Sequence, residues 1–220
     1  MKQSLLFIIV ISTLLSAGCK KDPVAAKGPV PIGTTNSTSY FPVTTGSSWK
    51  YLDDNTGFTF NITINDTTTT LLGNTYHNAQ NITQSFYKFD EEYFYAGNHV
   101  FATQFSDDLY GPLNLQVLND TMAVGHSWIG PASTSGTING YTSRAITTIK
   151  EKGIDYSIYG VKFSNVIHTQ VALQYYIGGT GLLYGTIDFY FAPGVGIIQS
   201  YFYLNQYHSE TRNITGYDIK

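Results

Sequence analysis

The chain has 220 residues, of which 15% are aromatic and only 12% are charged. Outside the first 39 residues, eight side chains are basic and fourteen are acidic, which gives a net charge near −6. A surface of that charge repels phosphate, so we expect no nucleic-acid partner.

The first 18 residues have the pattern of an export signal. Lys2 supplies a positive start, Leu5–Leu15 is an apolar run, and small residues follow it. A membrane-spanning helix needs about 20 apolar residues, so this shorter run predicts a signal that is removed after export.

Cys19 is the only cysteine of the chain and directly follows Gly18. The site resembles the lipidation motif of bacterial lipoproteins, with Ser16 where that motif usually has Leu, Val or Ile. The resemblance implies an extracytoplasmic protein that is anchored through lipid on Cys19. We expect the outer membrane, with either its periplasmic or its surface face.

Residues 19–39 are rich in Pro, Gly, Ser and Thr and contain little apolar surface. That composition predicts a flexible tether between the anchor and the folded part.

Residues 40–220 suffice for one β domain. Apolar and polar residues alternate in Gly57–Asp66 and again in Thr186–Phe191, which is the two-residue period of strands. Turn residues recur at intervals, as at Gly73-Asn74 and Lys152-Gly153. We predict an all-β fold: an antiparallel meander that is closed into a barrel, a half-barrel or a sandwich.

A short pattern occurs twice, about eighty residues apart. Val43–Trp49 and Met122–Trp128 share the spacing Gly-x-Ser-Trp, and both tryptophans of the chain lie in it. The repeat indicates either two similar halves of the domain or a coincidence in a sequence rich in Gly and Ser.

Two sequence blocks resemble a group of uncharacterised lipoproteins from the Bacteroidota. The first is Tyr40-Phe41-Pro42-Val43 with Gly46 and Trp49-Lys50-Tyr51, and the second is Ala192-Pro193-Gly194-Val195-Gly196. The resemblance implies an envelope lipoprotein and supplies no catalytic residues. In the second block, proline and two glycines suit a bend between strands.

The titratable residues form no recognisable catalytic or metal-binding motif. The five histidines have no metal-ligand spacing, and His168 on a polar strand face is expected to be solvated. Acidic pairs such as Asp53-Asp54 lie beside turn residues and are expected to be hydrated, with a weak calcium site as the alternative. No serine lies in a nucleophile elbow. We therefore predict no catalytic residues, no metal, no cofactor and no enzymatic activity.

Three tyrosines near the C-terminus share one strand face: Tyr201, Tyr203 and Tyr207. Tyrosine combines a large apolar area with a polar tip, so this face is a candidate ligand-binding site. The alternative is that tyrosine serves only as a good strand residue.

Two Asp-Thr sequences, at Thr67 and Thr121, match the O-glycosylation pattern of exported Bacteroidota proteins. The resemblance implies sugar attachment at these two threonines.

Three functions remain open. The first is a lipid-anchored binding module for an apolar, amphipathic or glycan ligand. The second is a structural or accessory protein that docks another envelope protein, and the third is a hydrolase with an unrecognised site. A cavity lined by apolar side chains favours the first, an exposed tyrosine face outside a solid core favours the second, and a cleft with histidine and carboxylates favours the third.

Overall fold

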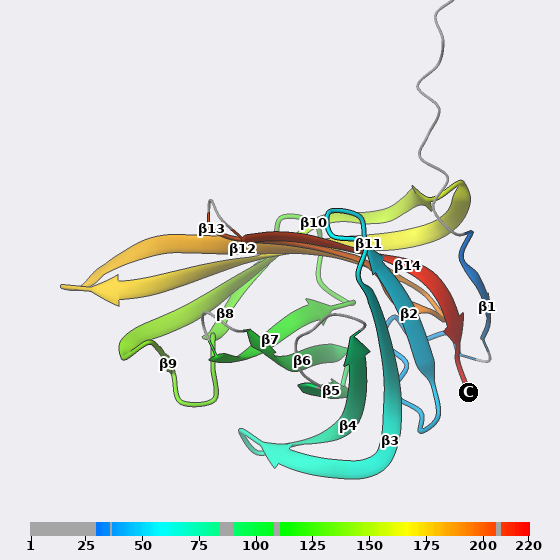
Figure 1. The fold of residues 1–220 in the computed structure, drawn as a ribbon. Coiled ribbons are helices and arrows are strands. Elements are labelled where there is room, and N and C mark those ends of the chain that lie inside the picture. Colours follow the sequence, from blue (N-terminus) through cyan, green and yellow to red (C-terminus); the bar gives the residue numbers. More distant parts are fainter. Residues whose placement is uncertain (1–29, 36, 84–89, 108–110, 206–207) are drawn as a thin grey trace, which may run out of the picture.

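The computed structural model describes residues 30–35, 37–83, 90–107, 111–205 and 208–220, and every regular element in these ranges is a β-strand (Figure 1). The strands are β1 Ile32–Thr34, β2 Ser48–Asp53, β3 Thr59–Leu71, β4 Asn74–Thr83, β5 Asp90–Gly97, β6 Val100–Asp107, β7 Gly111–Asn119, β8 Ser127–Pro131, β9 Thr137–Ile138, β10 Tyr141–Ile158, β11 Val161–Ile177, β12 Thr180–Ala192, β13 Gly196–Asn205 and β14 His208–Asp218. The described residues contain no helix that is long and apolar enough to cross a membrane. The prediction of an all-β fold is confirmed.

The sheet consists of two antiparallel meanders. One contains β2 to β7 in chain order, and the other contains β8 and β10 to β14, also in chain order. The pairing of β2 with β14 joins the two meanders, while β1 adds parallel to β14 and β9 pairs with the start of β10. The predicted antiparallel meander with two similar halves is therefore present.

The repeated sequence pattern forms the same turn at the start of each half. The Gly46 amide donates to the Ile64 carbonyl at 3.0 Å, and the Gly125 amide donates to the Ile149 carbonyl at 2.8 Å. In both cases the residue after the glycine accepts from the amide of the same isoleucine, at 2.9 and 3.0 Å. The two glycines have φ of 84° and 83°, a conformation that favours glycine. The pattern is thus a structural repeat.

The sheet curls until β7 lies against the inner face of the second meander, which nearly closes a barrel (Figure 1). At the outer edge of β7, side chains rather than a neighbouring strand donate hydrogen bonds to backbone carbonyls. The Thr147 and Thr169 hydroxyls donate to the carbonyls of Gln116 and Val117, each at 2.8 Å. The Trp128 indole donates to Gln116 as well, at 3.2 Å. These bonds explain why two threonines are buried on the inner face, since unpaired carbonyls there would cost free energy.

We predict that Thr169→Val lowers the free energy of unfolding by about 1–2 kcal/mol, because it leaves the buried Val117 carbonyl unpaired while keeping the side chain's shape. Thr186→Val is the control, since Thr186 points away from the barrel interior on the neighbouring strand β12. Urea denaturation measures both. An equal decrease of the unfolding free energy in the two variants would contradict the proposed role of Thr169 in the contact between β7 and the second meander.

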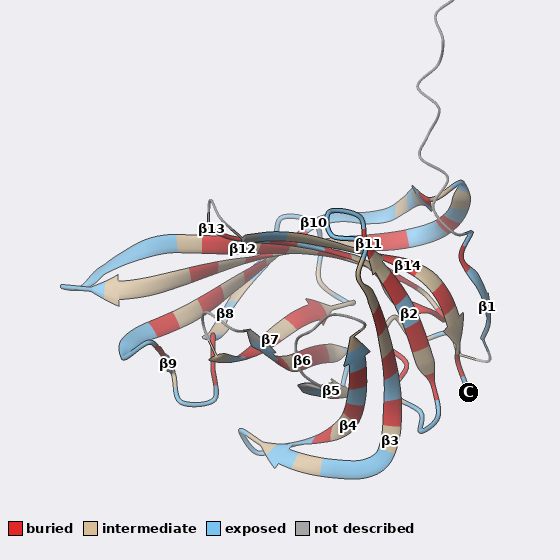
Figure 2. Ribbon diagram, in the orientation of Figure 1, coloured by how far each residue is buried: buried red, intermediate tan, exposed pale blue. Residues whose placement is uncertain are grey.

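Alternation of side chains fills the barrel with apolar residues. On β12, Ile187, Phe189 and Phe191 are buried, and the residues between them face outward (Figure 2). The strands around them contribute aromatic rings that contact one another, for example Phe105 and Phe202 with centroids 5.6 Å apart. The interior is thus a packed core.

The ordered domain begins before the predicted start at residue 40. Ile32–Thr34 pairs with Gly216–Asp218 of β14, so this part of the predicted tether is a strand. The Thr35 hydroxyl donates to the Gly194 carbonyl, and the Gly194 amide donates to the Ser39 carbonyl at 2.8 Å. The described part of the predicted tether is thus bound to β14 and to the turn at Gly194, while residues 19–29 lie outside the described residues.

The two sequence blocks, Tyr40–Tyr51 and Ala192–Gly196, meet at that turn. The Trp49 indole donates to the Val195 carbonyl at 2.6 Å, and the Tyr51 hydroxyl donates to the Ile197 carbonyl at 2.8 Å. The second block connects β12 to β13, which confirms the predicted bend. Its role is to fasten β2 and the N-terminal segment to the second meander.

We predict that Gly194→Ala costs at least about 3 kcal/mol of unfolding free energy. A Cβ atom would lie 2.5 Å from the Ser37 carbonyl oxygen, and the φ of 78° adds strain. Gly179→Ala is the matched control, since its φ is 83° but no atom lies within 4 Å of the added Cβ, so we expect only about 1 kcal/mol there. Thermal unfolding of both variants tests this, and similar losses would show that close packing at Gly194 contributes nothing.

One predicted turn is wrong. Lys152 and Gly153 lie inside β10, where the register to β11 shifts on both sides of the pair. Gly153 has a φ of 73°, so the glycine accommodates a β-bulge and the chain continues in the same direction.

Candidate functional site

A cavity of about 40 Å³, partly open to solvent, lies between the two meanders. Its wall is mainly aromatic: Phe41, Trp49, Phe94, Phe105, Phe189 and Phe202. One water occupies roughly 10–15 Å³ on this measure, so the cavity has room for about three water-sized groups. It is too small for a lipid acyl chain.

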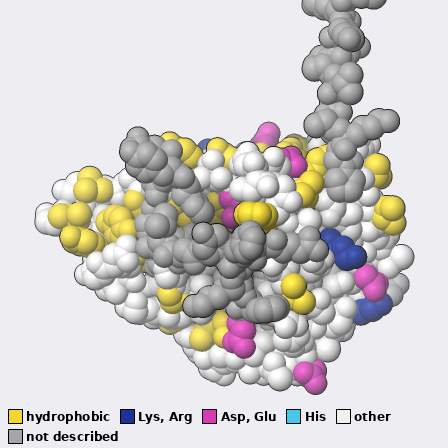
Figure 3. Space-filling view, viewed as in Figure 1, with side chains coloured by type: hydrophobic (Ala, Val, Ile, Leu, Met, Phe, Trp, Pro, Cys, Tyr) yellow, Lys and Arg dark blue, Asp and Glu magenta, His cyan; other side chains and the backbone are white. Residues whose placement is uncertain are grey.

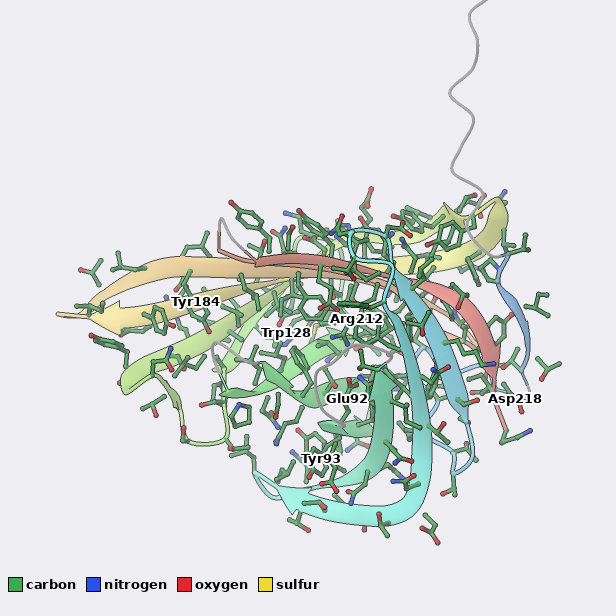
Figure 4. The ribbon with its side chains drawn as sticks, viewed as in Figure 1. Glu92, Tyr93, Trp128, Tyr184, Arg212 and Asp218 are labelled. Atoms are coloured by element: carbon green, nitrogen blue, oxygen red, sulfur yellow. The ribbon has the colours of Figure 1, made fainter. Side chains whose placement is uncertain are left out.

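Two charged side chains line this otherwise apolar space. Glu92 extends from β5 and Arg212 from β14, and both point into the barrel (Figure 4). The Asn81 amide donates to Glu92 Oε1 at 2.7 Å. Arg212 Nε donates to Glu210, while its guanidinium carbon lies 4.2 Å from the centroid of Phe60. The guanidinium is therefore held between a carboxylate and an aromatic ring.

Burial and neighbouring charges shift the pKa values in the charged cluster, which consists of Glu92, Glu210 and Arg212. Burial acts to lower the pKa of Arg212, but the carboxylates of Glu210 and Glu92 outweigh it and raise that pKa above its usual value. Burial, followed by the nearby Glu92 carboxylate, raises the pKa of Tyr51. Two carboxylates beside one guanidinium give these three side chains a net charge of −1. Burying such a cluster usually costs more than an apolar replacement would, which marks it as a candidate functional site.

Polar atoms of the cluster lack partners within the described part of the chain. The two Nη nitrogens of Arg212 make no hydrogen bond there, because the contact from Nη1 to Glu92 Oε1 is 3.7 Å long. The Asn81 side-chain oxygen is likewise buried without a hydrogen-bond partner among the described residues. The polar end of the cavity thus offers unused donors and an unused acceptor.

We predict that Arg212→Met lowers the free energy of unfolding by about 3 kcal/mol, because it removes the guanidinium that pairs with the buried Glu92 and the half-buried Glu210. Glu92→Gln is expected to cost about 1 kcal/mol, since Arg212 keeps Glu210 and the new amide can still accept from Asn81. Urea denaturation measures both variants. A larger loss for Glu92→Gln than for Arg212→Met would contradict this assignment of charges.

The predicted tyrosine face lies outside the barrel. Tyr201 and Tyr203 are exposed, and Phe202 and Leu204 between and beside them are buried, so the predicted alternation on this strand is confirmed. Tyr207 lies outside the described residues. The structure does not bring the tyrosine face and the cavity together, because they are on opposite sides of the sheet.

His168 is not simply solvated as the sequence predicts. Its Nδ1 lies 3.0 Å from Glu151 and its Nε2 lies 2.7 Å from Asp188, on the two neighbouring strands. The imidazole stacks on Tyr190, whose ring stacks on Tyr156 with centroids 4.3 Å apart. This cluster lies on the outer face of β10–β12 rather than in a cleft, and the described residues include no group of metal-binding side chains. The cluster cross-links three strands.

The acidic pair Asp53-Asp54 also differs from the expectation of a hydrated pair. Asp53 is buried and accepts hydrogen bonds from the Thr56 hydroxyl at 2.5 Å and from the Thr211 amide at 3.1 Å. Asp54 accepts from Tyr159 and Asn213. The pair caps the β2–β3 turn, and protein donors use the oxygens that a calcium ion would need.

The proposed modification sites are accessible where the structure describes them. Thr67 and Thr121 are both exposed, and the Thr121 hydroxyl donates to Asn119 at 2.7 Å. Cys19 lies outside the described residues.

An apolar patch covers the end of the β11–β12 hairpin, which extends beyond the barrel (Figures 1 and 3). Ile177, Leu182 and Leu183 are exposed there. Between Gln170 and Thr186 the sequence contains no charged residue.

Sequence reasoning missed Glu92 and Arg212 as cavity residues. Glu92 follows Asp90 and Glu91, an acidic run with the composition of a turn, although β5 begins at Asp90. The two-residue spacing from Glu92 to the buried Phe94 was the signal that could have placed both on the inner face. No comparable signal connects Arg212 to Glu92, which lies 120 positions earlier in the chain.

No family model and no curated protein matches the chain. Two solved structures resemble it at low identity. One is a predicted lipoprotein from Parabacteroides distasonis, with 14% identity and a TM-score of 0.42 over 83% of this chain and 99% of that one. The other is a predicted exported protein with a YmcC-like fold from Bacteroides fragilis, with 10% identity and a TM-score of 0.45 over 80% and 97% of the two chains. Likeness at this level assigns neither a family nor an activity.

Proposed function

We propose that this chain is a lipid-anchored envelope protein that binds a small, mainly apolar ligand inside its barrel and does not catalyse a reaction. The observation that carries the proposal is the aromatic cavity with Glu92 and Arg212 at its polar end. Ligand sites in proteins are typically concave, mostly apolar and equipped with a few polar groups that fix orientation.

The size of the cavity narrows the ligand class. An acyl chain does not fit, so the amphipathic ligands considered from sequence reduce to small molecules, or to the small end of a larger one. Glu92 accepts a hydrogen bond from Asn81 and faces Arg212. A carboxylate held in this way suits the role of orienting a ligand. These contacts support binding rather than acid–base chemistry.

The anchor is proposed from the sequence alone. Between Cys19 and the first described residue lie ten residues, which reach at most about 35 Å when extended. Because β1 is fixed to β14, such a tether would hold the domain close to the membrane.

We predict that Ser200→Leu abolishes ligand binding, because Ser200 lines the cavity and the larger side chain would fill it. Tyr201→Leu is the matched control, since the adjacent residue of β13 faces outward and its change leaves the cavity intact. Native mass spectrometry of each protein from its own envelope detects a bound small molecule. An adduct of equal intensity in both variants would place the ligand elsewhere, and its absence from the unchanged protein would contradict the proposal.

We predict that Cys19→Ser moves the protein from the membrane fraction to the soluble fraction and leaves the signal segment uncleaved or differently cleaved. Lipid chains contribute about 0.8 kcal/mol for each buried methylene, so their loss removes the anchor. Fractionation and intact-mass measurement give the readout. Unchanged membrane association and processing would contradict the anchor.

A second candidate function is docking of another envelope protein. The exposed Tyr201 and Tyr203 and the uncharged apolar patch at the hairpin end favour it, because aromatic and apolar residues without charge are typical of interface centres. A photo-reactive amino acid at position 203 tests it. A specific protein cross-linked to position 203 supports docking. If no protein is cross-linked there, under conditions in which the same amino acid in a control envelope protein does label its partner, docking is contradicted.

Sugar attachment at Thr67 and Thr121 is a further proposal from the sequence, and both side chains are accessible to a modifying enzyme. An intact mass from the native host that contains no added hexose would contradict it.

A further inference from the structure

The β11–β12 hairpin extends beyond the barrel as a two-stranded ribbon (Figures 1 and 2). The pairing of β11 with β10 ends at Tyr175, and the pairing of β12 with β13 ends at Thr186. Past these points, within the described residues, the two strands pair only with each other, as far as Ile177 and Thr180. At a rise of about 3.3 Å per residue, the three residues after Tyr175 project by about 10 Å.

Apolar side chains cover the inner side of this ribbon. Tyr175 follows the buried Leu173 by two residues and therefore lies on the inner side, as does the exposed Ile177. The exposed Leu182 is opposite Tyr175 in the register, which places it on the same side. Tyr184 stacks on Tyr175 with ring centroids 4.1 Å apart. The inner side thus combines two tyrosine rings with two exposed aliphatic side chains.

The outer side of the ribbon is also apolar at its end and has one cation at its base. Leu183 is opposite Gln174 on the outer side and is exposed, and Tyr176 lies two residues beyond Gln174. The Arg144 guanidinium carbon lies 4.6 Å from the centroid of the Tyr176 ring, and Arg144 Nε donates to Gln174 at 2.9 Å. Among the described acids, none forms an ion pair with Arg144. Its positive charge is therefore available to an anion.

A lipid bilayer fits this hairpin end better than a partner protein does. A protein that docks on a sheet covers one side of it, as would suffice for Tyr201 and Tyr203, whereas here exposed apolar side chains lie on both sides. A bilayer surrounds an inserted ribbon on both sides. Residues 171–187 contain no charged side chain, although the chain from residue 40 onward contains fourteen acids. Tyrosines beside an aliphatic end, followed by an arginine at the level of lipid phosphates, are typical of the membrane interface.

The length of the tether permits this contact. The Thr35 hydroxyl donates to the Gly194 carbonyl, so the tether leaves the domain near the end of β12 that is remote from the hairpin. The thirteen residues of β12 span about 43 Å. The ten residues between Cys19 and Val30 reach at most about 35 Å. A domain that leans along the membrane can therefore place its hairpin end on the surface, whereas a domain standing upright on that end would exceed the reach of the tether.

We propose that the end of the β11–β12 hairpin inserts into the head-group region of the bilayer that holds the lipid anchor, with its exposed Ile and Leu side chains at the acyl boundary and Arg144 beside a lipid phosphate. This inference rests on the proposed function, because it assumes that Cys19 carries lipid, but it does not depend on a ligand in the cavity. Segments that lie in the interface enter by about 5–10 Å, which matches the projecting part of the ribbon. The backbone groups at the two edges of the ribbon exclude deeper insertion, because hydrocarbon would leave them unpaired.

A fluorescent label measures the depth of the hairpin end. Leu183→Cys is labelled with a nitrobenzoxadiazole maleimide in the mature lipidated protein, in which the anchor uses the Cys19 thiol. Leu72→Cys at the end of the β3–β4 hairpin is the matched control, since Leu72 is 52% exposed and Leu183 61%. Both proteins are reconstituted in vesicles of phosphatidylethanolamine and phosphatidylglycerol that contain a lipid with a doxyl quencher near the head-group end of its acyl chain. We expect at least about threefold stronger quenching at position 183, because only that end lies at the acyl boundary.

Two further changes in the labelled Leu183→Cys protein test the role of its own side chains. Ile177→Asp places a charge at the hairpin end and should reduce the quenching at position 183 to the level at position 72. Arg144→Gln should lower the ratio of inserted to free hairpin about fivefold, which is the effect of one cation at an anionic membrane surface. Circular dichroism verifies that each variant is folded. Unchanged quenching in Ile177→Asp would attribute the insertion to the label and overturn the proposal.

Flotation with the vesicles separates failure of the insertion from failure of the anchor. A protein that does not float with the vesicles lacks the anchor, which overturns the proposed function together with this inference. A protein that floats but is quenched equally at positions 183 and 72 keeps the anchor and overturns insertion alone. A blue shift of the label at position 183 that grows with protein density, without quenching by the doxyl lipid, would also overturn insertion, because a second copy of the chain would then cover the hairpin end.

Discussion

The pairing of β2 with β14 is the contact on which the rest of the structure depends. In the strand order it is the ladder that connects one meander to the other. It sets Tyr217 opposite Trp49 and Arg212 opposite Asp53, with a register shift between Ile214 and Gly216, so this one ladder places both the core tryptophan and the cavity arginine. A slip of one residue by β14 would turn Arg212 to the outer face, because side chains alternate along a strand. The turn that carries Val195 binds the Trp49 indole and thereby resists such a slip.

The second requirement is that the barrel close without a continuous ladder. The β7 edge would otherwise present unpaired carbonyls to an apolar interior, which is costly. Thr147 and Thr169 on β10 and β11 supply hydroxyls to that edge, so the seam is sealed by side chains. The same curling of the sheet brings β5 and β14 together around the cavity.

The parts of this fold that the sequence could predict are those set by near neighbours in the chain. Alternation placed Phe202 inside and Tyr201 outside, and the Gly-x-Ser-Trp repeat corresponds to a pair of equivalent turns. The failures involve partners that are distant in sequence. Ile32–Thr34 lies in a polar stretch of the sequence, and it forms a strand because it pairs with Gly216–Asp218 of β14. His168 was expected in solvent, yet its two carboxylate partners belong to the strands on either side. Lys152-Gly153 has the composition of a turn, and only the register to β11 makes it a bulge.

The candidate site shows the same limit and suggests why the cluster has a function. Glu92 and Arg212 are recognisable as inner residues from alternation, but their proximity depends on how far the sheet curls. A barrel of this composition could be filled with apolar side chains at lower cost than with three charged ones. The stacking of Arg212 on Phe60 and its bond to Glu210 fix the guanidinium beside the cavity. That fixed position adds little to stability if the Nη donors stay unpaired, and it becomes favourable when an incoming oxygen accepts from them. A bound ligand would therefore offset the free-energy cost of burying this cluster. For this reason we assign the proposed function to the interior and not to the exposed tyrosine face.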